Sequence, residues 1–211
     1  MPLFTRKEID SKASLILWEI NEKEDDLLSQ ITLHPSDSER FKRFTHENKR
    51  KEFLALRCCL SEYFGENPEV FYTEDGKPYL KNDHFVSFSH SRQYAGIIVS
   101  KSVEVGLDLE LYREGILRIA HKFMRPEEDA SLAEETKIEH ITYYWGAKEV
   151  MVKITGDRKH NFLTELSVKP FDYSNCVQST GFISAKNYRK QVCLFFEKKD
   201  DLFITYGWEQ T

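Results

Sequence analysis

Residues 103–110 read Val-Glu-Val-Gly-Leu-Asp-Leu-Glu, the most regular alternation of apolar and polar side chains in the chain. The pattern predicts a β-strand with one apolar face. Its other face carries Asp108 and Glu110, which are two residues apart and therefore point to the same side. Two neighbouring carboxylates repel each other, and a hard cation that prefers oxygen, above all Mg²⁺, relieves that repulsion. The plainer alternative is the acidic end of an ordinary surface strand.

A long helix is expected downstream, from about Lys137 to Thr155, with Gly156 as its stop. Trp145, Glu149 and Lys153 follow one another at i, i+4 and i+8, so they lie along one flank of that helix. We expect the indole to anchor the flank in the core. The carboxylate could then complete a metal site or accept a proton, and the ammonium could neutralise a phosphate. An ordinary Glu–Lys helix pair gives the same spacing. The expected apolar stripe of the helix is Ile138, Ile141, Trp145 and Val152.

The remaining sequence predicts strands and helices on both sides of these two elements. Ser36 and Glu39 have the spacing of a capping box, and the helical periodicity that follows ends near Gly65. A short helix is expected to open at Pro126. Strands are expected over Ser14–Ile20, His84–His90, Tyr94–Ser100 and several stretches between Leu166 and Trp208. The order strand, helix, strands, helix, strands predicts the α+β class.

The composition limits the classes of protein that this chain can be. Its 211 residues, 40% of them hydrophobic, suffice for one compact core or two small lobes. A net charge of −5 disfavours general binding to nucleic acid or to an anionic membrane. The sequence shows no secretion signal and no membrane span, so a cytoplasmic location is expected. Four cysteines without a Cys-x-x-Cys pair are expected to be reduced thiols: Cys58, Cys59, Cys176 and Cys193.

Three further features are weaker indicators. From Ser38 to Leu60, seven Lys and Arg residues outnumber three Glu residues, a local excess of four positive charges in an acidic chain. Gly76-Lys77-Pro78 predicts a turn, and Ser89 with His90 closes a strand where a loop begins. Each has an ordinary structural interpretation: a solvated helix face, a surface turn and a structural histidine.

Four motifs occur together in one order: Gly76-Lys77-Pro78, Ser-Phe-Ser-His-Ser (87–91), Val-Gly-Leu-Asp-Leu-Glu (105–110) and Trp-Gly-Ala-Lys-Glu-Val-Met-Val-Lys (145–153). The set resembles the Sfp-like 4′-phosphopantetheinyl transferases. Their pattern is Gly-Lys-Pro, a Phe-Asn-Ile-Ser-His-Ser-like segment, Gly-(Ile/Val)-Asp-(Ile/Leu)-Glu, and Trp-x-x-Lys-Glu-x-x-x-Lys ahead of a glycine. The resemblance runs from about Arg40 to Gly156.

This resemblance implies two similar α/β lobes in a pseudo-twofold arrangement, residues 1–102 and 103–211, with the active site in the cleft between them. It implies an enzyme that moves the 4′-phosphopantetheine arm of coenzyme A to a serine of an apo acyl or peptidyl carrier protein and releases 3′,5′-ADP. A monomer would suffice, since one chain supplies both walls. Carrier proteins of this kind are typically acidic, which gives the basic segment a possible docking use.

The resemblance also assigns roles by motif position. Asp108, Glu110 and Glu149 would hold Mg²⁺ against the pyrophosphate of coenzyme A, and Lys153 would neutralise phosphate charge. Glu149 would accept the serine proton, directly or through a water. The residues that would contact coenzyme A are Arg40, Lys77, Ser89, His90 and Lys153.

The sequence departs from the family pattern at two places. Ser87 stands where the family has Asn, and the segment after Gly156 reads Asp-Arg-Lys-His rather than a second glycine and an apolar residue. That segment could shape the choice of carrier or acyl group. Two alternatives stay open. One is a Mg²⁺-dependent phosphodiesterase or nuclease; the other is a non-catalytic scaffold that binds coenzyme A or a carrier protein.

Overall fold

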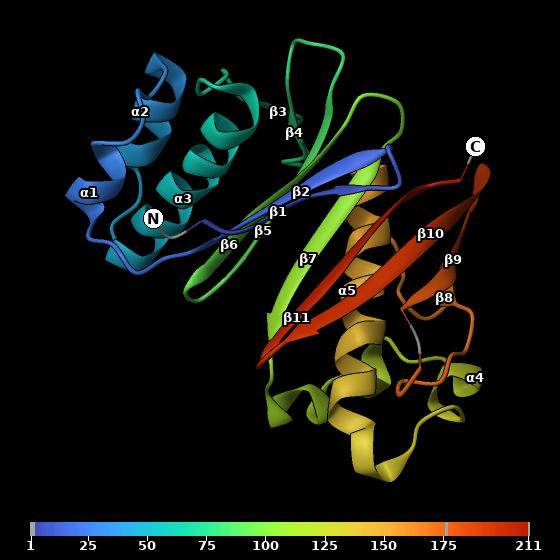
Figure 1. Ribbon diagram of the computed structural model, residues 1–211. Helices are drawn as coiled ribbons and strands as arrows, with labels where there is room; N and C mark the ends of the chain where they lie inside the picture. Colours follow the sequence, from blue (N-terminus) through green and yellow to red (C-terminus); the bar gives the residue numbers. More distant parts are fainter. Residues whose placement is uncertain (1–2, 176, 211) are drawn as a thin grey trace. The chain divides into compact units, whose positions relative to one another are not determined.

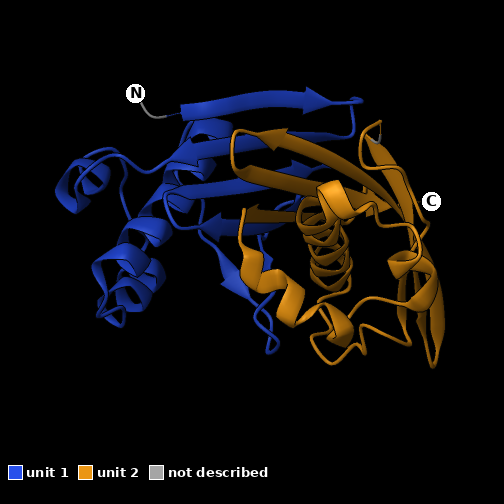
Figure 2. Cartoon of the chain, turned by 90° about the horizontal axis from the view of Figure 1, so that it is seen from below, with its two compact units in different colours: residues 1–102 blue, residues 103–211 orange. Residues whose placement is uncertain are grey.

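The computed structural model describes residues 3–175 and 177–210. The chain divides into two compact units, Met1–Ser102 and Val103–Thr211, which Figure 2 draws in different colours. Each unit has its own antiparallel sheet and its own apolar core. This mixture of helices and several sheets agrees with the expected α+β class.

The first unit is a four-stranded antiparallel sheet with helices on one side (Figure 1). Its strand order is β1-β2-β6-β5. The strands are β1 (Leu3–Ile9), β2 (Ala13–Glu19), β5 (Phe85–Ser91) and β6 (Tyr94–Ser100). The helices are α1 (Glu24–Leu28), α2 (Pro35–Lys42) and α3 (Glu47–Phe64), and a short hairpin is formed by β3 (Phe71–Tyr72) and β4 (Pro78–Tyr79). The apolar face of α3 packs on β2 and β6, so this core depends on contacts between segments far apart in sequence.

The second unit is a five-stranded antiparallel sheet of order β7-β11-β10-β9-β8, whose strands curve around one long helix (Figure 2). The strands are β7 (Val105–Leu111), β8 (Leu166–Val168), β9 (Gln178–Ala185), β10 (Tyr188–Lys199) and β11 (Leu202–Glu209). The helices are α4 (Pro126–Asp129) and α5 (Lys137–Thr155), with 3-10 turns at η1 (Glu114–Arg118), η2 (Ala120–Lys122) and η3 (Glu134–Thr136). The helix α5 fills the concave side of the sheet.

Most element positions follow the sequence signals. The helix α3 ends at Gly65 with φ of 79°, and α5 ends at Gly156 with φ of 76°, the left-handed conformation that glycine adopts without strain. Pro126 begins α4 as expected. The strand predicted over Ser14–Ile20 is β2, shifted by one residue.

Three expectations are wrong. Ser36 and Glu39 form no capping box, because α2 begins one residue earlier at Pro35 and the Ser36 hydroxyl bonds Glu69 instead. The strand β1 has no counterpart among the expected strands. The helix α5 is not amphipathic with a single stripe, since the sheet and its connections bury it on most sides, including His140 and Lys148.

Two smaller findings concern thiols and membranes. Cys58, Cys59 and Cys193 are free thiols, as expected, and Cys176 lies outside the described residues. Among the described residues, no helix has the length and apolarity needed to cross a bilayer.

Candidate active site

A close approach between α5 and the sheet brings the charged side chains of the second unit together. Two glycines permit it. A Cβ at Gly106 on β7 would lie 2.5 Å from the carbonyl oxygen of Val150, and a Cβ at Gly146 on α5 would lie 2.6 Å from Oγ1 of Thr205. Both distances are shorter than real Cβ contacts, so only glycine fits. Strand β11 places Thr205 directly opposite Asp108, so α5 passes beside the acidic part of β7.

The flank of α5 predicted from sequence does face the two carboxylates of β7. The indole Nε1 of Trp145 donates to Oε1 of Glu110 at 2.8 Å. Two turns further along, the ammonium of Lys153 donates to Oδ1 of Asp108 at 2.8 Å and to the carbonyl oxygen of Leu107 at 2.6 Å. Trp145 itself is only partly buried, so it lies at the edge of the core rather than inside it. Helix and strand are therefore linked at both ends of the flank.

Glu149 lies between these two links, and its acidity is strongly changed. Burial is the main cause, followed by repulsion from Asp108, and together they raise the pKa of Glu149 to about 7 against the opposing charges of Lys153 and Arg158. Burial, and then the charge of Asp108, also raise the pKa of Glu110. The three carboxylates thus repel one another.

This donor set fits a hard divalent cation in its chemistry, because mutually repelling, half-buried carboxylate oxygens are the ligands that Mg²⁺ prefers. The residues that would hold the ion are Asp108, Glu110 and Glu149. Among the described residues, however, no three His, Cys, Asp or Glu side chains converge closely enough to count as a formed metal cluster. Asp108 instead uses one oxygen for Lys153.

In the first unit, His90 lies in a hollow of about 820 Å³. The hollow is lined by the residue after β2, by residues at and just before the start of α3, by His90 of β5 and by the turn that follows β5: Ile20, His46, Asn48, Lys49, Lys51, Glu52, His90, Arg92 and Gln93. Its one carboxylate, Glu52, is nearly buried and meets Nδ1 of His90 at 3.2 Å and the ammonium of Lys49 at 2.7 Å. Cationic and imidazole groups outnumber this acid, so the hollow suits an anionic ligand.

The other coenzyme-contact candidates of the first unit, Arg40, Lys77 and Ser89, are not among the residues that line this hollow. The Arg40 guanidinium stacks 3.8 Å from the centre of the Tyr72 ring, and Tyr72 pairs across the β3–β4 hairpin with Pro78. Arg40 is therefore a neighbour of the Gly76-Lys77-Pro78 turn, in which Gly76 has φ of 82°. Ser89 is buried within β5 and is not part of the lining.

Four cationic or imidazole side chains of the hollow are not singled out by any sequence motif: His46, Lys49, Lys51 and Arg92. The sequence indicates Lys49 and Lys51 only as members of a basic helix. Their spacing carries no signal for a concave site, because the opposite wall comes from the turn after His90, some forty positions later in the chain. The local excess of positive charge is the one indicator that the sequence offers.

The glycine contacts make a prediction about Gly106→Ala. The added methyl group would clash with the Val150 backbone oxygen and push α5 away from β7. We therefore expect the free energy of unfolding to fall by about 1–3 kcal/mol. Urea unfolding measures the loss. Gly115→Ala is the matched control, since a Cβ there lies 3.3 Å from the flexible end of Arg118. Equal stability of the two variants would contradict the close approach.

Comparison with known proteins finds several curated relatives, all named 4′-phosphopantetheinyl transferases. The chain is 33% identical over 144 residues to the transferase HetI of Nostoc sp., a match that covers 60% of each protein. It is 28% identical over 131 residues to a transferase of Bacillus subtilis, covering 56% of this chain and 58% of that one. It is 27% identical over 115 residues to the transferase AcpT of Escherichia coli, a match that covers 51% of this chain and 59% of AcpT.

The resemblance seen in the motifs is therefore confirmed by similarity to named enzymes of this type. The chain spans about 60% of the length of the curated relatives that it matches. No family model matches the chain.

Proposed function

We propose that this protein transfers the 4′-phosphopantetheine arm of coenzyme A to a serine of an acyl or peptidyl carrier protein and releases 3′,5′-ADP. The observation that carries the proposal is the meeting of the α5 flank with the acidic strand β7, in a chain whose curated relatives are named for this reaction. The proposal includes a cytoplasmic monomer built of two similar lobes.

The acceptor step requires a base for the serine hydroxyl, and Glu149 is suited to it. With no cation bound, the pKa of Glu149 is raised to about 7, so its carboxylate accepts a proton near neutral pH; a cation held by the same carboxylates would lower this pKa. The serine oxygen forms a bond to the β-phosphorus of coenzyme A, the bond from that phosphorus to 3′,5′-ADP breaks, and the serine proton passes to Glu149.

Charge on the pyrophosphate must be balanced while this bond breaks. Lys153 supplies one positive charge next to Asp108 and is restrained by the Leu107 carbonyl, so its ammonium is held near the acidic strand before a ligand arrives. When bound by Asp108, Glu110 and Glu149, Mg²⁺ would supply further neutralisation of the pyrophosphate.

The hollow around His90 is proposed to hold the phosphorylated nucleotide end of coenzyme A. Its cationic groups come from two separate segments, α3 and the turn at Arg92, which suits a dianionic phosphate better than an extended protein surface. Lys49 and Lys51 then serve the coenzyme. Arg40 on α2, Lys77 in the β3–β4 turn and Ser89 in β5 are proposed as further contacts.

This part of the proposal predicts a phosphate-specific effect of His90→Ala. We expect the affinity for coenzyme A to fall roughly 10- to 100-fold, the loss of one charge-assisted hydrogen bond. The affinity for dephospho-coenzyme A, which lacks the 3′-phosphate, should change little. Calorimetric titration of both ligands measures the difference, with Lys42→Ala as control because Lys42 on α2 is exposed and paired with Glu39. Equal losses for both ligands would place the phosphate elsewhere.

A further inference from the structure

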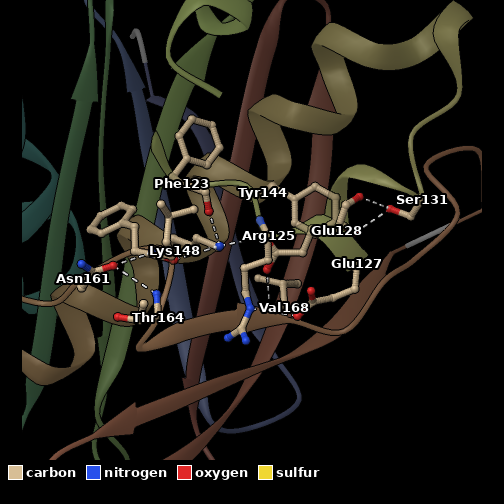
Figure 3. Close-up of polar contacts among 12 residues, drawn as sticks. Phe123, Arg125, Glu127, Glu128, Ser131, Tyr144, Lys148, Asn161, Thr164 and Val168 are labelled. Atoms are coloured by element: carbon tan, nitrogen blue, oxygen red, sulfur yellow. Dashed lines mark hydrogen bonds and ion pairs between the residues drawn. The ribbon is translucent and has the colours of Figure 1, made fainter. Parts of the chain in front are cut away.

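A second charged cluster lies in the second unit, and it is completely buried. The side chains of Lys148 and Glu128 have no exposed surface, and their charged atoms are 2.7 Å apart (Figure 3). Glu128 also accepts hydrogen bonds from the backbone N–H groups of Arg125 at 2.8 Å and Val168 at 2.9 Å. The carboxylate therefore joins the start of α4 to strand β8 and to the middle of α5.

The ammonium of Lys148 is fully used within the protein. Besides Glu128 it donates to the carbonyl oxygen of Phe123 and, at 3.1 Å, to the carbonyl oxygen of Phe162. An ammonium has three N–H donors, so each of them has a partner. Lys148 is directly next to Glu149 in sequence, yet it points into the unit and does not join the carboxylate site.

The two phenylalanines that Lys148 holds by their backbones both contact Trp145. The centre of the Phe123 ring lies 5.1 Å from the centre of the indole in an edge-to-face arrangement, and the centre of the Phe162 ring lies 5.6 Å from it. Between these rings the indole is oriented so that Nε1 donates to Glu110 at 2.8 Å. A continuous series of contacts thus connects the buried ammonium to a carboxylate of the candidate active site.

We propose that Lys148 and Glu128 are positioning residues that orient Glu110 through Phe123, Phe162 and Trp145. The pair fixes two backbone segments, their rings fix the indole, and the indole fixes which oxygen of Glu110 remains available. This inference rests on the proposed function for its kinetic consequence, but the orientation of Trp145 is independent of any activity.

A purely stabilising role is the alternative, and it makes a different prediction. Replacing a buried ion pair by neutral side chains of similar size is often neutral for stability. The variant Glu128→Gln/Lys148→Met removes both charges, and its amide oxygen can still accept from one of the two backbone N–H groups, of Arg125 and Val168, that donate to Glu128. If the pair only stabilised the fold, molecules of this variant that do fold would keep the site unchanged.

The experiment uses the full chain labelled with 5-fluorotryptophan, whose three tryptophans are Trp18, Trp145 and Trp208. In Glu128→Gln/Lys148→Met, we expect the fluorine resonance of Trp145, assigned with Trp145→Phe, to shift while the other two stay in place. We also expect kcat per folded molecule to fall about 10- to 100-fold, the size of loss found when residues that orient the ligands of a metal site are replaced. The KM for coenzyme A should change by less than about threefold, because the loss concerns the reacting groups.

The matched control is Lys190→Met/Glu209→Gln, which removes an ion pair of the same length, 2.7 Å, from the same unit. It should leave both the Trp145 resonance and kcat unchanged. The positioning role would be overturned if the Trp145 resonance did not shift in Glu128→Gln/Lys148→Met. It would also be overturned if the resonance shifted while kcat stayed at the wild-type value. Absence of transfer in the wild-type protein would instead overturn the proposed function, and the fluorine spectra would still decide the orientation of Trp145.

Discussion

Glu149→Gln abolishes most of the transfer activity and, at alkaline pH, makes the folded protein more stable. Loss of the general base is expected to lower kcat about 10²- to 10⁴-fold. The amide keeps the shape of the side chain but neither accepts the serine proton nor carries the charge of a metal ligand. Turnover with an apo carrier protein measures this loss.

The stability gain follows from the raised pKa of Glu149. In the unfolded chain this carboxyl group ionises near pH 4.5, whereas in the folded protein it ionises near pH 7. The contribution of Glu149 to wild-type stability therefore falls as pH rises from about 4.5 through 7, because the folded state holds this proton more tightly. Since the group is partly exposed, we expect the variant to exceed the wild type by about 2 kcal/mol at pH 8 and by almost nothing below pH 4.5.

Urea unfolding at both pH values, in the presence of a chelator, tests this pattern. Glu139→Gln on the same helix is the control, because Glu139 is partly exposed and its ion pair with Lys198 is long at 3.9 Å. Millimolar Mg²⁺ should stabilise the wild type more than Glu149→Gln, because the ion relieves the same repulsion. A stability difference that does not grow with pH, or one that Mg²⁺ leaves unchanged, would contradict the assignment of Glu149 to an acidic cation site.

Lys148→Met is expected to cause the largest loss of stability in the second unit, about 3–5 kcal/mol, because it leaves the Glu128 carboxylate buried without its cation. The carbonyl groups of Phe123 and Phe162 lose a donor at the same time. The midpoint of urea unfolding, followed by tryptophan fluorescence, measures the effect.

Two comparisons make this prediction specific. Lys190→Met removes a cation from a half-exposed pair with Glu209 and should cost about 1 kcal/mol or less. Adding Glu128→Gln to Lys148→Met should recover part of the lost stability, since the buried charge disappears. If Lys148→Met and Lys190→Met were equally stable, the burial of the Lys148–Glu128 pair would have no energetic consequence.

The candidate site of the second unit is predictable from sequence because its geometry is local. Alternation on β7 and the i, i+4, i+8 spacing on α5 each fix which side chains share a face, so the two patterns alone group Asp108 with Glu110 and Glu149 with Lys153. The helix ends are equally local, set by Pro126 and by glycines that adopt the left-handed conformation.

The errors concern features that tertiary contacts decide. The strand β1 carries charged residues between its apolar ones and stands at the edge of its sheet, where only pairing with β2 makes it a strand. Lys148 and Glu128 received no role from the sequence. Their burial depends on their own ion pair and on backbone groups contributed by distant segments. The hollow at His90 has the same origin, since its two walls are about forty residues apart.

The most direct test of the proposed transfer is intact-mass spectrometry of an apo acyl carrier protein incubated with this protein, coenzyme A and Mg²⁺, alongside a chelator control. We expect a mass gain of one phosphopantetheine arm that the chelator suppresses and that Glu149→Gln fails to produce. Absence of any gain across acyl and peptidyl carriers, while coenzyme A still binds, would contradict it and favour a non-catalytic scaffold.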